Sequence, residues 1–144
     1  MLYRSLALLL VACLAGCAGR IAGAGENEPT EEAQLAARAA STPYPTNLRA
    51  SNNWRAAALV DRRTNSIRVI NFENRPLRDA DVWVNHSFVH HVGTIPPNGY
   101  VVLSRNGFYD ASGNSLANVN TSVVQAQVQT EGNLYDLQGP IAVD

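Results

Sequence analysis

Hydrophobic and polar residues alternate in short runs over about the last 90 residues of the chain. The clearest run covers residues 122–130, where Val124, Ala126 and Val128 fall on one side of an extended strand. The intervening glutamines 125, 127 and 129 fall on the other side. This period of two predicts a strand with the valine side in the core and the glutamine row in solvent. At a sheet edge, the same strand could pair with a strand of a partner.

Further runs of this kind predict strands over residues 56–61, 66–73, 79–85, 87–92, 99–104 and 134–138. Turn sequences separate them, among them Asn85-His86, which favours a tight hairpin turn because asparagine tolerates a positive φ. No helical pattern of useful length lies between them. About seven short strands with frequent turns predict an all-β fold, a small antiparallel β-sandwich of the Ig-like kind, over residues 54–144.

The hairpin sequence INFENRPLRDADVWVN, residues 70–85, supports the same fold. It resembles the strand–turn–strand opening of bacterial Ig-like and fibronectin-III-like accessory domains. The resemblance covers one hairpin and implies a β-sandwich without indicating an activity.

The first sixteen residues have a different pattern, that of an export signal. Arg4 precedes a nearly unbroken apolar run over residues 6–14, and Ala15 and Gly16 are small. This run is shorter than the roughly 20 residues that a spanning helix needs. The next residue is Cys17, and Leu-Ala-Gly-Cys resembles the lipobox of bacterial lipoproteins.

That resemblance implies cleavage before Cys17 and attachment of acyl chains to its thiol and new amino terminus. It implies a cell-envelope protein attached to the membrane by its lipid, and Ala18 favours the outer membrane, facing the periplasm. A plain secretory signal with an incidental cysteine is the alternative. Cys13, the only other cysteine, would leave with the signal, so the mature chain would have no disulfide and no cysteine ligand for a metal.

Residues 17–53 are rich in Gly, Ala, Pro and polar residues, which predicts a lipidated N-terminus followed by a flexible linker. Two alternatives remain open. Residues 31–40 could form a short helix with Thr30 as its N-cap, and Tyr44 and Leu48 could pack on the domain.

Composition excludes several kinds of chemistry. All eleven basic residues are arginine, and without lysine the chain has no Schiff-base residue and no phosphate-binding lysine. From residue 54 onward, seven arginines stand against eight acids, so no basic region favours nucleic acid. No Gly-x-Ser-x-Gly elbow supports a triad of Ser104, His90 and Asp110.

The histidines at 86, 90 and 91 form a cluster in the sequence, but His90 and His91 would point to opposite faces of one strand. Asp110, Ser112 and Asn114 resemble a calcium loop, although the pattern is also that of an ordinary Asp turn. We therefore predict no catalytic residue, no metal and no cofactor.

Trp83 and Tyr109 are the candidate ligand-binding residues, because exposed aromatic rings stack on sugars and peptides. The sequence thus predicts a non-catalytic structural or protein-interaction module anchored in the envelope, with a membrane and an envelope protein or cell-wall polymer as partners. The alternative is a carbohydrate- or peptide-binding envelope lipoprotein.

Overall fold

A computed structural model describes residues 28–143 of the chain, and Cys17 and the predicted export signal lie outside them. The described part contains one α-helix, one short 3₁₀ helix (Arg105–Gly107) and eight strands. Their bounds are α1 Glu31–Ser41, β1 Ala56–Asp61, β2 Ser66–Asn71, β3 Leu77–Val84, β4 Phe88–Ile95, β5 Gly99–Ser104, β6 Ala126–Thr130, β7 Asn133–Asp136 and β8 Gln138–Val143.

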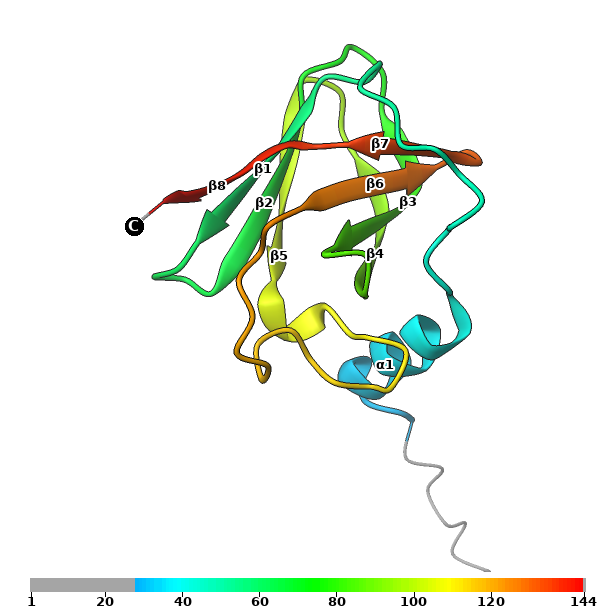
Figure 1. Cartoon of the computed structure of the whole chain (residues 1–144), viewed down its shortest axis with the longest axis vertical. Helices are drawn as coiled ribbons and strands as arrows, with labels where there is room; N and C mark the ends of the chain where they lie inside the picture. The colour runs from blue at the N-terminus through cyan, green and yellow to red at the C-terminus, as the bar shows by residue number, and fades with distance from the viewer. Residues whose placement is uncertain (1–27, 144) are drawn as a thin grey trace, which may run out of the picture.

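The strands form two four-stranded sheets, in the orders β5-β2-β1-β8 and β4-β3-β6-β7, so the predicted small β-sandwich is confirmed (Figure 1). All pairs of neighbouring strands are antiparallel except one, since β8 runs parallel to β1. The sequence pattern missed β8 because residues 138–143 lack the alternation of polar and apolar residues that marks a half-buried strand.

The main core lies between the two sheets, where the inward-facing side chains of β1, β2, β3 and β6 are fully covered. Ala126 and Val128 belong to it, as predicted. Val124 does not, and 74% of its surface is exposed. The reason is that β6 begins only at Ala126, while the backbone N–H groups of Val124 and Gln125 donate to Oδ1 of Asn85 instead of to a neighbouring strand.

Residues with positive φ form the hairpin turns that were predicted. Asn85 and His86, at φ 50° and 59°, join β3 to β4, and Glu131 and Gly132, at 48° and 75°, join β6 to β7. Two successive residues in this region match the right-handed twist of the strands on either side. Both hairpins belong to the sheet β4-β3-β6-β7.

The predicted flexible linker is wrong for residues 31–53, and the alternatives of a helix and of packing on the domain are confirmed. Thr30 is the N-cap of α1, and its hydroxyl accepts from the N–H of Ala33 at 3.3 Å. The helix and the chain that follows it cover the outer face of β4-β3-β6-β7, where they bury a second apolar cluster (Figure 1). This cluster contains Leu35, Ala36, Ala39, Tyr44, Leu48, Ala50, Trp83, Val89, Tyr109 and Leu134.

Candidate functional site

Trp83 and Tyr109, the aromatic residues predicted to bind a ligand, are brought together but covered. They are 2% and 8% exposed in the second apolar cluster. The ring of Tyr44 meets the indole of Trp83 edge to face, with the ring centroids 5.3 Å apart. The indole N–H of Trp83 donates to Oε1 of Gln129 at 3.2 Å. A sugar could stack on Trp83 only if the N-terminal segment moved away.

The prediction that the glutamine row faces solvent is wrong for Gln127, while Gln125 and Gln129 are half-buried. Gln127 is 2% exposed and bridges two segments. Its Oε1 accepts from the hydroxyl of Tyr44 at 2.7 Å, and its Nε2 donates to Oδ1 of Asp136 at 2.8 Å. The side of the strand is as predicted, but residues 35–50 replace water there, and the amide has protein partners instead of solvent.

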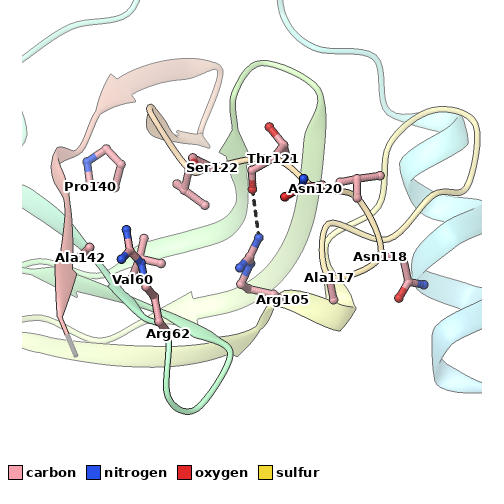
Figure 2. A pocket seen from close by; sticks show the side chains of 12 residues that line it. Val60, Arg62, Arg105, Ala117, Asn118, Asn120, Thr121, Ser122, Pro140 and Ala142 are labelled. Atoms are coloured by element: carbon pink, nitrogen blue, oxygen red, sulfur yellow. Dashed lines mark hydrogen bonds between the residues drawn. The ribbon is translucent and has the colours of Figure 1, made fainter.

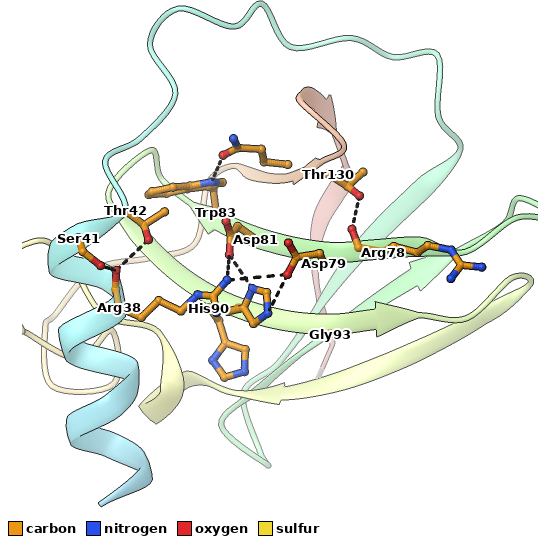
Figure 3. Close-up of polar contacts among 12 residues, drawn as sticks. Arg38, Ser41, Thr42, Arg78, Asp79, Asp81, Trp83, His90, Gly93 and Thr130 are labelled. Atoms are coloured by element: carbon orange, nitrogen blue, oxygen red, sulfur yellow. Dashed lines mark hydrogen bonds and ion pairs between the residues drawn. The ribbon is translucent and has the colours of Figure 1, made fainter. Parts of the chain in front are cut away.

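Acidic and basic groups join α1 to the sheet beside this cluster (Figure 3). Nδ1 of His91 lies 2.9 Å from Oδ1 of Asp81, and Nε2 lies 3.3 Å from Oδ1 of Asp79. The guanidinium of Arg38, in the last turn of α1, lies 3.8 Å from Asp81 and 4.0 Å from Asp79. Because Arg38 supplies a positive charge to both carboxylates, the arrangement is that of an ion-pair network holding the helix.

His90 points to the opposite face of β4 from His91, as predicted. Its Nδ1 lies 2.7 Å from the carbonyl oxygen of Gly107, which fixes the tautomer with the proton on Nδ1. Burial lowers the pKa of His90, an effect that the bond to Gly107 partly opposes. A Cβ on Gly107 would lie 2.7 Å from the imidazole, so this ring requires glycine at that position.

The three residues of the hypothetical triad are not hydrogen-bonded to one another in the described chain. Ser104 and His90 line the same cavity of about 390 Å³ between α1 and β5, together with Glu31 and Glu32. Oγ of Ser104 accepts from the N–H of Asn106. Asp110 does not line this cavity.

Asp110 accepts hydrogen bonds within a turn, which is the ordinary Asp turn given above as the alternative to a calcium loop. Its Oδ1 accepts from the N–H groups of Ser112 and Asn114, and its Oδ2 accepts from the side chain of Asn114 at 2.9 Å. These bonds, with that to the Asn114 amide the largest effect, lower the pKa of Asp110. Within residues 28–143 no group of three or more His, Cys, Asp or Glu side chains is arranged to hold a metal ion.

A cleft of about 590 Å³ opens on the other side of the sandwich (Figure 2). One wall is β8, through Pro140 and Ala142, and the other is the irregular segment 117–123. In Figure 2 the side chains of Arg62 and Arg105 extend toward the space between these walls. The cleft lies where residues 117–123 run toward β6 without pairing with a strand.

Arg105 holds the second wall in place. Its Nη2 donates to the carbonyl oxygens of Leu116 at 3.4 Å and Thr121 at 3.2 Å. Its Nε is buried and has no hydrogen-bond partner, and within residues 28–143 no carboxylate lies within ion-pair distance of its guanidinium. The residues that line the cleft include two arginines and no acid. The cleft is therefore positive in a protein of net charge −1.

Sequence reasoning did not find this cleft. Arg62 stands in a turn and Arg105 in the 3₁₀ helix, 43 positions apart, and neither belongs to a motif. The one available signal was the length of the segment between the predicted strands at 99–104 and 122–130, which is long for a hairpin connection.

In the part of the chain that the structure describes, no helix is long and apolar enough to cross a membrane. Comparisons with protein-family models, with curated proteins and with solved structures found no match to this chain.

Proposed function

We propose that this protein is a lipid-anchored component of a bacterial cell envelope, and that its β-sandwich is a non-catalytic structural or protein-interaction module. The observation that carries the proposal is the sequence Leu14-Ala15-Gly16-Cys17 directly after the apolar run of residues 6–14. A thiol at that position is the group that accepts a lipid in lipoproteins. Several acyl chains hold a protein to a bilayer far more firmly than one.

The packing of α1 on the domain supports a shorter tether than the predicted linker of residues 17–53. Only residues 18–27 separate Cys17 from the described chain. At no more than about 3.6 Å per residue, the eleven steps from Cys17 to Glu28 reach at most about 40 Å. A linker to residue 53 would have allowed a much longer reach. The proposed lipid anchor therefore keeps Glu28, where the described chain begins, within about 40 Å of the bilayer.

The proposal of a non-catalytic module is supported by the hydrogen bonds of the residues that could have been catalytic. His90, Ser104 and Asp110 each bond to nearby backbone atoms. His91 belongs to the ion-pair network that holds α1. Burial of Trp83 removes the observation on which carbohydrate stacking depended, and a protein partner becomes the better candidate.

The anchor can be tested by metabolic labelling with a palmitate analogue and by membrane fractionation. We expect wild-type protein to incorporate the label and to sediment with membranes, while Cys17→Ala loses the label and is released. Cys13→Ala is the matched control, because it changes the other cysteine within the same short segment and should behave as wild type. Unlabelled wild-type protein together with membrane-bound Cys17→Ala would overturn the proposal.

A further inference from the structure

We propose that the cleft between β8 and residues 117–123 binds an extended peptide segment of a partner protein, through a carboxylate on Arg105 and Arg62 and through strand pairing with β8. This inference rests on the proposed function as an interaction module and names the chemistry of its partner. A volume of about 590 Å³ is within the range of known ligand sites, roughly 300–1,000 Å³.

The charges in the cleft favour an anionic ligand. The guanidinium of Arg105 is partly buried and has no counter-ion within residues 28–143, and its Nε has no acceptor. Buried charged groups are normally paired, since their loss of water must be offset by hydrogen bonds. The carbonyl oxygens of Leu116 and Thr121 accept hydrogen bonds from Nη2 of Arg105, but they carry no negative charge. Nε of Arg105 is buried and its Nη2 already donates to these two carbonyls, so a carboxylate in the cleft would be bound by Nη1 of Arg105 and by the guanidinium of Arg62.

The walls of the cleft favour a peptide over a small free acid. β8 is the last strand of its sheet, and among the described residues only β1 pairs with it. It contains no charged residue, and Pro140 and Ala142 are the two of its residues that line the cleft. Pro140 has no N–H, so a further strand would pair with β8 through the carbonyl of Pro140 and the backbone groups on either side of it. Such an edge offers unpaired backbone groups to another strand. Opposite it, residues 120–125 are in no helix or strand. A peptide lying along β8 would place alternate side chains toward Arg105.

Binding can be measured by amide chemical shifts and calorimetry on the purified protein. The probes are the blocked pentapeptide acetyl-Val-Thr-Glu-Thr-Val-amide and its partner with glutamine in place of glutamate. Sodium acetate is the probe for a free acid. We expect the glutamate peptide to bind about tenfold more tightly than the glutamine peptide and to shift the amides of β8 and of residues 117–123. We expect acetate to cause no saturable shift in β8.

Arg62→Gln is the main variant, because the side chain of Arg62 makes no hydrogen bond or ion pair in the described chain and its loss should leave the fold intact. Arg63→Gln is the matched control in the same turn, since Arg63 does not line the cleft. The first variant should lose most of the preference for glutamate and the second should keep it.

Two results with the peptides would overturn the inference: no binding of either peptide at millimolar concentration, or equal binding of both. Saturable binding of acetate that is also lost in Arg62→Gln and that shifts no amide of β8 would overturn it as well. None of these measurements depends on Cys17. A failure here would therefore leave the lipid anchor standing, and a failure of the labelling experiment would leave the peptide site standing.

Discussion

The hydroxyl of Tyr44 donates to Oε1 of Gln127, which lies 83 positions further along the chain, at 2.7 Å. This bond joins the segment after α1 to β6 across a face of the sheet from which water is excluded. Burial raises the pKa of the Tyr44 hydroxyl, so it stays protonated and remains a donor at neutral pH.

Replacing Tyr44 by Phe should therefore lower the free energy of unfolding by on the order of 1–3 kcal/mol, because it leaves the buried Gln127 oxygen without its donor. Urea titration followed by circular dichroism measures this. Tyr100→Phe is the matched control, since Tyr100 is 57% exposed, and its effect should stay within about 0.5 kcal/mol. Equal losses in the two variants would mean that the 2.7 Å bond contributes nothing specific.

Substitution by Asp at either of two neighbouring positions of β6 should lower the free energy of unfolding, for different reasons. Val128→Asp places a charge in the main core and should cost about 4 kcal/mol or more, enough to unfold a domain of ordinary stability. Gln127→Asp brings a second carboxylate toward Asp136, whose Oδ1 now accepts from Gln127, and should cost about 2 kcal/mol. Thermal unfolding ranks the two variants.

Gln125→Asp serves as the control for that pair, because Gln125 precedes β6 and its side chain makes no hydrogen bond in the described chain. It should be nearly silent. If Gln127→Asp were equally silent, residue 127 would face water, and the packing of the N-terminal segment over it would be wrong.

Gln127 and Trp83 also show how far the sequence could predict this fold. Period-two alternation assigned Gln127 correctly to the side of its strand away from the main core, and it separates Trp83 from Val82 and Val84, because side chains alternate strictly along a strand. Alternation cannot say what covers that outer side. The cover comes from α1 and from the chain that follows it, and the small apolar residues of α1, such as Ala39, give little sign of burial in the sequence. The sequence cannot show whether the side chain of Gln127 forms its hydrogen bonds with water or, as here, with Tyr44 and Asp136.

The cleft was beyond prediction for a related reason. Arg105 acts on Leu116 and Thr121 through their backbone carbonyls, which carry no sequence signature. The other wall of the cleft, β8, contains a proline and is exposed almost throughout, so neither propensity nor alternation marks it as a strand.

The docking of α1 should depend on Ala39, which is 2% exposed against the second apolar cluster. Ala39→Asp would bury a charge there and should release the helix while leaving the sandwich folded. Trypsin should then cleave after Arg38 and Arg49 about tenfold faster or more, since cleavage of a segment follows the population of its open form. Ala37→Asp makes the same change on the exposed side of α1 and should cleave at the wild-type rate. Equal rates in the two variants would contradict the docking.

The free energy of unfolding should decrease as the pH is lowered, and part of this decrease should come from His90. Burial lowers the pKa of His90 in the folded protein below the value of about 6.5 that histidine has in an unfolded chain. As the pH falls through 6.5, the unfolded state therefore binds a proton before the folded state does, and the free energy of unfolding decreases. Above 6.5 both states are neutral at this position and the contribution is fully present.

His90→Asn should remove this part of the pH dependence, because asparagine does not titrate. The Nδ2 group of asparagine can take the place of Nδ1 as the donor to the carbonyl of Gly107, so the fold should be retained. Urea titrations of both proteins at intervals between about pH 5 and pH 8 give the two slopes, and their difference isolates His90 from the other titrating groups. The wild-type slope should be the steeper. Parallel curves would show that His90 has the same proton affinity folded and unfolded, and that its ring is not held in the buried position against Gly107.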